Sequence, residues 1–442
     1  MNLENKKVLV VGLGKSGKAA CDLLHTMNAE VSLYDGNTGL DVSGYDAPVY
    51  LGEVPDEMLA AFQCAVFSPG VPLDIPLAGK LREYGIPVIG EIELAFLREK
   101  GVVAGITGTN GKTTTTTLVG EIMKAYNEET YVVGNIGDPY TNEVEKTSAQ
   151  SVTVAEISSF QLETIDAFCP AVSAILNITP DHLNRHKTME EYRRVKLLIT
   201  KNQTERELCV LNYDDAFLRS QAEELPCEIA FFSSSQKVEH GLYQNENKQI
   251  IDAETGQILM SMSECHLPGD HNCENIMAAI LITRRLGVPM EKILETVKAF
   301  RAVEHRVEFV KNTAGVDYYN DSKGTNPDAA IKGIQSMSRP TILIGGGYDK
   351  GGEFDEWIES FDGRVKRLLL LGATKERIAE TAESHGYTDY EFVSSLEEAV
   401  KRAAELAEDG DAVLLSPACA SWDMFDSYEQ RGTLFKEYVQ KL

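Results

Sequence analysis

A stretch rich in glycine and threonine, GITGTNGKTTT at residues 105–115, has the residue types that bind a triphosphate. Ile106 stands where the usual phosphate loop has its first glycine, but Lys112 and Thr113 follow in the usual order. Glycine at every third position lets backbone N–H groups point toward an anion at a helix N-terminus. The alternative is a structural turn whose threonines cap a helix, but such a turn gives Lys112 no role. We therefore expect ATP, or another triphosphate, to bind here, with Lys112 on the β- and γ-phosphates and Thr113 on Mg²⁺. The expected contacts are Gly108, Thr109, Asn110, Gly111, Lys112, Thr113 and Thr114.

A second glycine loop, GLGKSG at residues 12–17, follows the apolar run KKVLVV near the N-terminus. With Asp35 placed 18 residues after Gly17, it fits the dinucleotide fingerprint. Alone it indicates only a diphosphate near the start of a helix. The chain is therefore either a nicotinamide dehydrogenase with an extra ATPase-like domain, or an ATP-driven ligase whose first domain binds another nucleotide. No hydride-transfer constellation follows, which favours the ligase.

Two segments carry candidate magnesium ligands. Glu156 ends the apolar run TVAE, which reads as an interior strand beside the phosphate loop, and an acid there needs a cation. In LNITPDHLNRH, His182 directly follows a predicted strand and is expected to be a ligand or an orienting group, whereas we interpret His186 as structural. Composition alone makes Lys196 a solvated lysine.

A pair of amides marks a candidate nucleoside site. Asn272 and Asn275 stand three residues apart at the start of a predicted helix, so they share one face. Amides pair with the edges of adenine, and the alternative is that Asn272 caps the helix.

These residues require three α/β units to position them. Strand, loop and helix patterns recur at KKVLVVGLGKSGKAACDLL, at VVAGITGTNGKT and, after a β-rich stretch around residues 207–260, from FRAVEHRVEFV onward. We predict an α/β fold with a Rossmann-like N-terminal domain, a central P-loop ATPase-like domain and a Rossmann-like C-terminal domain. The predicted domains span residues 1–92, 93–299 and 300–442.

The composition excludes several classes of protein. A formal net charge of −26 over 442 residues argues against nucleic acid as a partner. The longest apolar runs are strand-sized, which predicts no membrane insertion, and MNLENKK leads straight into a strand without a signal peptide. Eight cysteines without a C-x-x-C pair indicate reduced thiols. We expect a cytoplasmic protein and a monomer.

Eight motifs together resemble the Mur ligases: GITGTNGKTTT, GNIG, EISSFQLE, NITPDHLNRH, PGDHNCEN, HRVE, NDSKGTNPDA and LLSPACASWDMF. They occur in order along essentially the whole chain. The resemblance implies an ATP-dependent ligase that adds D-glutamate to UDP-N-acetylmuramoyl-L-alanine through an acyl phosphate, in the synthesis of peptidoglycan precursors. The D-N-P-R signature of relatives that add diaminopimelate is absent from the sequence. A folylpolyglutamate-synthase-like ligase, the alternative within the superfamily, would need a pterin pocket and no UDP loop.

The resemblance also implies roles for single residues. The UDP substrate would contact Gly14, Lys15, Ser16, Gly17, Asp35, Ser68, Gly70, Asn135, Ser158 and Gln161. ATP would further contact Asn272, Asn275, Arg306 and Asp321, and D-glutamate would contact Lys323, Thr325, Lys350 and Ser421. Two Mg²⁺ ions would be held by Thr113, Glu156, His182 and Lys196, the last converted by CO₂ into a carbamate. Gly36 and Asn37 depart from the side chains with which relatives grip uracil.

Overall fold

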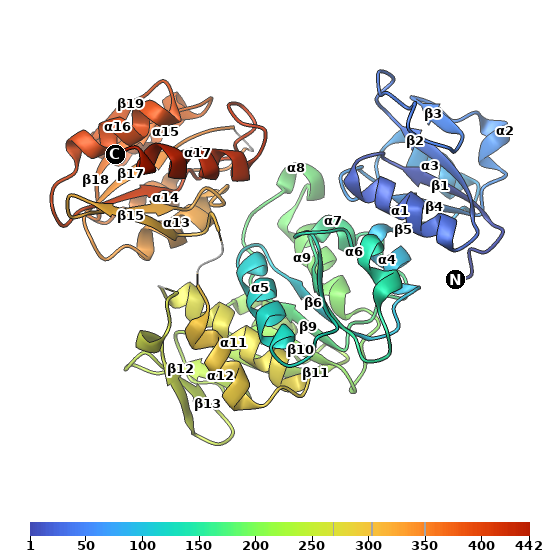
Figure 1. The fold of residues 1–442 in the computed structure, drawn as a ribbon, viewed down its shortest axis with the longest axis horizontal. Coiled ribbons are helices and arrows are strands. Elements are labelled where there is room, and N and C mark those ends of the chain that lie inside the picture. The colour runs from blue at the N-terminus through green and yellow to red at the C-terminus, as the bar shows by residue number, and fades with distance from the viewer. Residues whose placement is uncertain (268, 302–303, 349–350) are drawn as a thin grey trace. The chain divides into compact units, whose positions relative to one another are not determined.

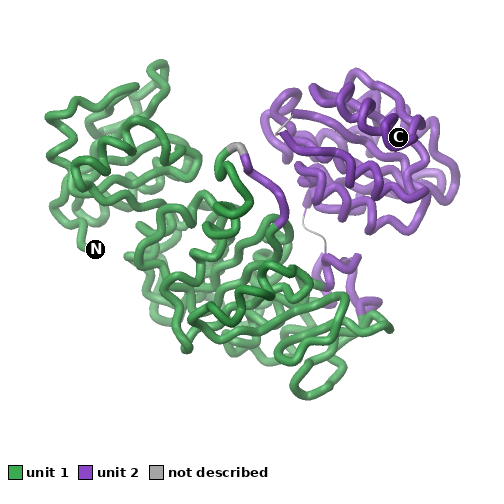
Figure 2. The backbone as a smooth tube through the Cα atoms, turned by 180° about the vertical axis from the view of Figure 1, so that it is seen from behind, with its two compact units in different colours: residues 1–178, 185–261, 274–297 green, residues 179–184, 262–273, 298–442 purple. Residues whose placement is uncertain are grey.

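A computed structural model describes residues 1–267, 269–301, 304–348 and 351–442 (Figure 1). It contains three β-sheets flanked by helices, so the predicted α/β class with three domains is confirmed. The chain forms two compact units, coloured in Figure 2. Unit 1 comprises residues 1–178, 185–261 and 274–297, and unit 2 comprises residues 179–184, 262–273 and 298–442. Among the described helices, none is both long and apolar enough to cross a membrane.

The first sheet belongs to unit 1 and is entirely parallel, in the order β3-β2-β1-β4-β5. Its strands are β1 (Lys7–Val11), β2 (Glu30–Asp35), β3 (Val49–Leu51), β4 (Cys64–Phe67) and β5 (Val88–Gly90). Its helices are α1 (Lys15–Thr26), α2 (Asp56–Leu59) and α3 (Pro76–Glu83). The four apolar residues at the end of β1 are all buried, as expected for a central parallel strand covered on both faces.

The second sheet, also in unit 1, has the order β14-β13-β12-β11-β10-β9-β6-β8-β7. It is parallel except near one edge, where β13 pairs antiparallel with both β12 and β14. Its strands are β6 (Val102–Thr107), β7 (Thr130–Gly134), β8 (Val152–Glu156), β9 (Val172–Ile175), β10 (Leu208–Asn212), β11 (Glu228–Ser233), β12 (Gly241–Gln244), β13 (Gln249–Asp252) and β14 (Ile258–Ser261). Its helices are α5 (Lys112–Lys124), α6 (Tyr140–Glu143), α7 (Ser159–Leu162), α8 (Leu183–His186), α9 (Met189–Leu197), α10 (Ala216–Gln221), α11 (Asp270–Arg285) and α12 (Met290–Ala299).

The third sheet belongs to unit 2 and has the order β15-β16-β20-β17-β18-β19, parallel except for β15. Its strands are β15 (Glu308–Thr313), β16 (Val316–Asn320), β17 (Thr341–Gly345), β18 (Val365–Leu370), β19 (Tyr390–Phe392) and β20 (Ala412–Leu415). Its helices are α13 (Pro327–Gln335), α14 (Asp355–Glu359), α15 (Lys375–Ser384), α16 (Leu396–Leu406) and α17 (Tyr428–Gln440). Alternate residues of β17 and β20 join a core with α13–α15 on one face and a core with α16 and α17 on the other.

Helix α4 (Glu91–Phe96) ties the end of the first sheet to the second within unit 1. Its Glu93 is buried, and its carboxylate accepts backbone N–H bonds from Asp166, Ala167 and Phe168 at 2.8–3.0 Å. The predicted domain boundary at 92/93 falls inside this helix, and the one at 299/300 falls at the end of α12. Both boundaries stay predictions.

We predict that Glu93→Gln lowers the free energy of unfolding by about 1–3 kcal/mol, because an amide –NH₂ then faces a buried backbone donor. Denaturant titration measures the effect, with Glu83→Gln on the exposed face of α3 as the matched control. Equal stability of the two variants would contradict this role for Glu93.

Candidate active site

The phosphate loop lies between β6 and α5, as the sequence predicts. Two of its glycines have backbone conformations that other residues rarely adopt, Gly108 with φ +150° and Gly111 with φ +83°. A Cβ at Gly111 would lie 2.3 Å from Oδ1 of Asn275. Asn275 also accepts a hydrogen bond from Thr115 Oγ1 at 3.2 Å. The start of α11 therefore packs against this loop, which supports the expected place of Asn275 near a nucleotide.

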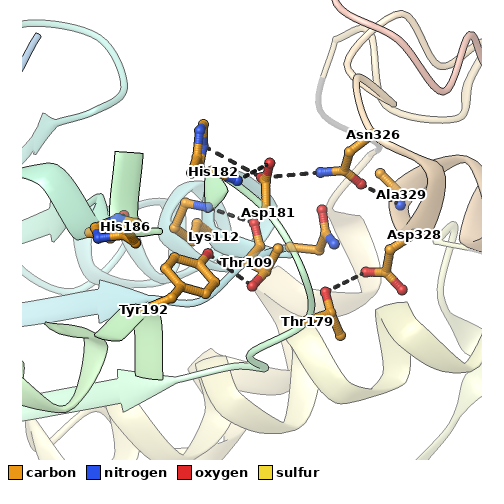
Figure 3. Close-up of polar contacts among 12 residues, drawn as sticks. Thr109, Lys112, Thr179, Asp181, His182, His186, Tyr192, Asn326, Asp328 and Ala329 are labelled. Carbon is orange, nitrogen blue, oxygen red and sulfur yellow. Dashed lines mark hydrogen bonds and ion pairs between the residues drawn. The ribbon is translucent and has the colours of Figure 1, made fainter. Parts of the chain in front are cut away.

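Lys112 extends along the loop and donates to Gly108 O at 2.8 Å. It also donates to Thr109 O at 2.7 Å (Figure 3). The loop is further held by Asn177, whose side chain accepts from Asn110 N–H at 2.8 Å and donates to Asn110 O at 3.1 Å. The hydroxyls of Thr109 and Tyr192 lie 3.0 Å apart. Sequence reasoning did not single out Asn177, although it stands in the quoted motif NITPDHLNRH.

Glu156 occupies the end of β8, an interior strand that pairs with β6 so that Glu156 lies opposite Ile106. The side chain is 1% exposed. Asn135 Nδ2 donates to Oε1 at 2.9 Å, while Oε2 is buried without a hydrogen-bond partner among the described residues. A buried carboxylate oxygen that no donor satisfies is costly, and a hard cation is the partner that suits it. Glu156 therefore fits the expected magnesium ligand.

The neighbouring threonines are also buried. Thr113 is the second residue of α5, and Thr114 follows it with a hydroxyl that has no hydrogen-bond partner in the described part of the chain. Within the described residues, no group of three or more His, Cys, Asp or Glu side chains is arranged to hold a metal ion. An ion at Glu156 would thus need oxygen ligands from a bound phosphate, which is the usual mode for Mg²⁺.

Lys196 differs from the expectation drawn from composition. The side chain is 1% exposed on α9 and does not reach solvent. Its Nζ donates to Gly108 O at 2.9 Å and to Thr107 Oγ1 at 3.3 Å, and lies 5.0 Å from the ring centre of Tyr192. Tyr192, Val195 and Ile199, at three- and four-residue spacing beside Lys196, form an apolar face that is also buried. The interpretation as a solvated lysine was wrong, because the phosphate loop supplies polar partners inside the core.

His182 and His186 have different surroundings. The strand β9 ends at Ile175, so His182 does not directly follow it as predicted. His182 has φ +55°, a left-handed conformation that is uncommon for residues other than glycine, and its Nε2 lies 3.5 Å from Asp181. His186 is buried, and its Nε2 lies 2.9 Å from Ser159 Oγ. That packing agrees with the structural interpretation of His186.

Unit 2 contains a cavity of about 420 Å³. Its lining includes His182, Thr325, Asp328 and Tyr348. The Asn326 side chain donates to Asp181 at 3.3 Å, and Thr179 Oγ1 donates to Asp328 at 3.0 Å (Figure 3). The structure thus brings His182 and Thr325, two predicted site residues, to one cavity.

Other predicted residues of unit 2 lie at the ends of its strands. Burial raises the pKa of Asp321 to about 6, while Ser416 Oγ donates to its carboxylate at 2.7 Å. Arg306 has a buried Nε without a partner in the described part of the chain. The Lys323 ammonium lies 5.2 Å from the ring centre of Tyr428, and Ser421 is buried. Lys350 lies outside the described residues.

Asn272 lies inside α11, which begins at Asp270, and its N–H donates to Gly269 O. It is therefore not the N-cap, and the capping alternative was wrong. Asn272 and Asn275 share this helix at the predicted spacing, and both are buried.

The first glycine loop precedes α1, whose N-cap Gly14 supplies no side-chain hydrogen bond. Asp35 accepts from Leu13 N–H at 2.9 Å, and Ser68 Oγ donates to Gly12 O at 2.8 Å. A Cβ at Gly17 would lie 1.8 Å from Gly12 O, so only glycine fits there. Asp35, Ser68 and Gly17, which are predicted to contact the substrate, therefore also stabilise the conformation of the first glycine loop. Lys15, Ser16 and Gly17 lie in the first turn of α1, and Gly70 is exposed after β4.

Two further predicted substrate residues bond to each other. Ser158 and Gln161 form a capping box at α7, in which Gln161 Oε1 accepts from Ser158 N–H at 2.9 Å. Gln161 Nε2 donates to the buried Glu91 at 3.5 Å. Desolvation raises the pKa of the Glu91 carboxyl above its usual value. The amide of Gln161 thus has a structural role in this arrangement.

Comparison with known proteins gives matches along the chain. Residues 6–90 match a family model described as Mur ligase MurD-like, N-terminal domain; residues 106–283 match Mur ligase middle domain; and residues 305–419 match Mur ligase, glutamate ligase domain. The chain is 52% identical to the UDP-N-acetylmuramoylalanine--D-glutamate ligase of Lachnospira eligens, with 100% of both chains covered. It is 48% identical to the ligase of the same name from Clostridioides difficile, again with 100% of both covered.

Solved structures share the fold at lower identity. The UDP-N-acetylmuramate-alanine ligase MurC of Thermotoga maritima matches with a TM-score of 0.63 at 18% identity, covering 99% of both chains. MurF ligase of the same organism, in complex with ADP, matches with a TM-score of 0.63 at 19% identity, covering 99% of this chain and 96% of that one.

The matched domains, together with the phosphate loop and its buried acid, define an ATP-dependent ligase that forms amide bonds. The chain belongs to the Mur ligase family. This membership decides between the two hypotheses raised by the glycine loops in favour of the ligase.

We predict that Glu156→Gln leaves the ligand-free protein no less stable, because it removes a buried charge, but abolishes the stabilisation by Mg²⁺ with ATP. Thermal unfolding with and without Mg²⁺ and ATP measures both effects. Glu121→Gln, on the exposed face of α5, is the matched control. An undiminished Mg²⁺–ATP shift in Glu156→Gln would contradict the assignment.

Proposed function

We propose that the protein adds D-glutamate to UDP-N-acetylmuramoyl-L-alanine, with ATP converted to ADP and phosphate, as a step of peptidoglycan precursor synthesis. The observation that supports this most is the 52% identity over the complete length of a ligase with that name. The buried acid beside the phosphate loop supports the ATP-using half of the reaction independently.

The reaction requires an activated carboxylate, because an amine does not displace an oxygen from a free carboxylate. The alanyl carboxylate attacks the γ-phosphorus of ATP and ADP leaves, giving an acyl phosphate. The amine of D-glutamate then attacks the acyl carbon, loses a proton and expels phosphate. Both steps bring anions together, so electrostatic positioning is the main task of the site.

Different residues of the chain position the phosphates and the metal ions. Lys112 steadies the β- and γ-phosphates, and the N–H groups at the start of α5 bind their oxygens. By the resemblance to the Mur ligases, Thr113 and Glu156 would hold one Mg²⁺, and His182 and the carbamate of Lys196 would each supply a ligand to a second. Mg²⁺ bound there would screen the charge of the phosphates.

The remaining residues bind the substrates. UDP lies on the first glycine loop with Asp35, Ser68 and Gly70, while Asn135, Ser158 and Gln161 face the muramoyl part. Asn272, Asn275, Arg306 and Asp321 bind the remainder of ATP. Lys323, Thr325, Lys350 and Ser421 bind D-glutamate, because two carboxylates need cations and hydroxyls. We further propose that the enzyme is a cytoplasmic monomer.

Carbamylation of Lys196 is supported by its burial, since the residue is 1% exposed. CO₂ reacts with a neutral amine, and burial favours the neutral form. The product, an N-carboxylate, exchanges a cation for an anion with hard oxygen atoms, which suits an ion beside a triphosphate.

Coupled measurement of ADP release tests the function. We expect ADP release to require UDP-N-acetylmuramoyl-L-alanine and to be fastest with D-glutamate in a panel of amino acids. Release that is independent of both substrates would refute the proposal, and turnover with a folate in place of the muramoyl substrate would establish the alternative.

For the carbamate, we predict that Lys196→Ala lowers kcat by about 100-fold or more, and that added short carboxylic acids partly restore it by replacing the lost oxygen ligand. Removal of bicarbonate should slow the unaltered enzyme. Lys201→Ala, at a half-exposed lysine on the same segment, is the control. Near-normal turnover of Lys196→Ala would refute the role.

A further inference from the structure

Arg431, in the first turns of α17, is a buried cation that the proposed reaction does not use. Its side chain is 2% exposed, and all of its N–H groups have partners. Nε donates to Ser322 Oγ at 2.9 Å, and Nη2 donates to Ser322 O at 2.8 Å and Cys419 O at 3.2 Å. Nη1 donates to Cys419 O at 3.3 Å and Ala420 O at 3.4 Å. The guanidinium is thus shared between two segments, residues 321–325 and residues 416–421.

Such burial is costly for a charged group. Desolvation lowers the pKa of Arg431 to about 10. In the described part of the chain, no carboxylate lies within 4.0 Å of the guanidinium; its partners are carbonyl and hydroxyl oxygens. An apolar side chain of similar volume would avoid the cost of burying the charge. What only arginine supplies is a planar fork with five donors, which fixes several acceptors at once.

The acceptors neighbour predicted ligands of the amino acid. Ser322 precedes Lys323, and Ala420 precedes Ser421. Other bonds extend the network, since Ser322 Oγ donates to Tyr428 O at 2.8 Å and Tyr348 N–H donates to Ala420 O at 2.9 Å. The segment around Ala420 also has a strained backbone, because Ala418 has φ +58°. The same two segments are also joined by the hydrogen bond from Ser416 Oγ to Asp321. Arg431 adds bonds to Ser322, Cys419 and Ala420, which lie close in sequence to Lys323 and Ser421.

We propose that Arg431 is a positioning residue, which sets the spacing between Lys323 and Ser421 and so the geometry with which the two carboxylates of the acceptor amino acid are bound. This inference rests on the proposed function, because it takes D-glutamate as the acceptor. Arg431 does not touch the substrate; it acts through the two loops.

The test uses the full-length protein and compares Arg431→Lys, Arg431→Met and Ser322→Ala with Lys323→Ala, which removes a predicted direct ligand. Arg339→Lys, at a half-exposed arginine of the same unit that donates to Gly315 O, is the matched control. The KM values for D-glutamate, ATP and UDP-N-acetylmuramoyl-L-alanine are measured separately, together with the thermal midpoint.

We expect Arg431→Lys to raise the KM for D-glutamate about tenfold or more, the equivalent of losing one or two hydrogen bonds. The KM values for the other two substrates should change less than about twofold. Lysine keeps the charge but lacks the planar fork of donors, so the KM for D-glutamate should be raised in Arg431→Lys as it is in Arg431→Met. Ser322→Ala should change the same KM in the same direction by a smaller factor.

An unchanged KM for D-glutamate in Arg431→Lys would overturn the inference, and so would equal increases for all three substrates, which a purely structural role predicts. If neither Arg431 variant folds, Ser322→Ala decides: a selective rise in the KM for D-glutamate supports the inference, and an unchanged value overturns it. Failure of the unaltered enzyme to use D-glutamate would instead refute the proposed function.

Discussion

The position of Glu156 is the constraint on which the central part of unit 1 depends. Because β6 and β8 are parallel neighbours, their carboxyl ends meet at one edge, and the acid stands beside the loop that receives a triphosphate. Asn135 satisfies one oxygen of Glu156, while the other lacks a partner within the described residues. The same Asn135 donates its backbone N–H to Glu156 O, and a Cβ at Gly134 would lie 2.3 Å from that oxygen. The GNIG motif therefore keeps the acid in place and leaves one oxygen for an ion.

The phosphate loop is held from several sides by residues distant in sequence. Asn177 bonds to the Asn110 peptide, Asn275 packs against Gly111, and Lys196 donates to Gly108 O. Each contact fixes a backbone group that must already be oriented when charge develops, since preorganised dipoles cost no reorganisation during the reaction. These contacts hold the loop in place, which offsets the conformational freedom of its glycines and the weak helix propensity of its threonines.

Much of this site could be predicted from the sequence, because glycine loops and apolar strands are local signals. Neighbouring residues were enough to predict the phosphate loop, the interior strand that ends at Glu156 and the helix that carries Asn275. The burial of Lys196 could not be predicted from its neighbours, because a lysine beside an apolar stripe usually reaches solvent. Its hydrogen-bond partners lie 88 and 89 positions away in the sequence. The end of β9 was misplaced because Leu176 and Ile178 are buried, so the apolar run continues after strand pairing stops.

Unit 2 also has a buried acid at the carboxyl edge of adjacent parallel strands. Asp321 follows β16 and Ser416 follows β20, two adjacent parallel strands, so their side chains meet at the carboxyl edge and bond at 2.7 Å. Burial raises the pKa of Asp321 to about 6 and lowers that of Arg431 to about 10, so both charges are kept at an energetic cost. A domain selected only for stability would replace such groups with apolar ones. Asp321 lies just after β16 and Arg431 in the first turn of α17, so unit 2 buries both groups, at a cost in stability, beside the loops for which we propose ligand contacts.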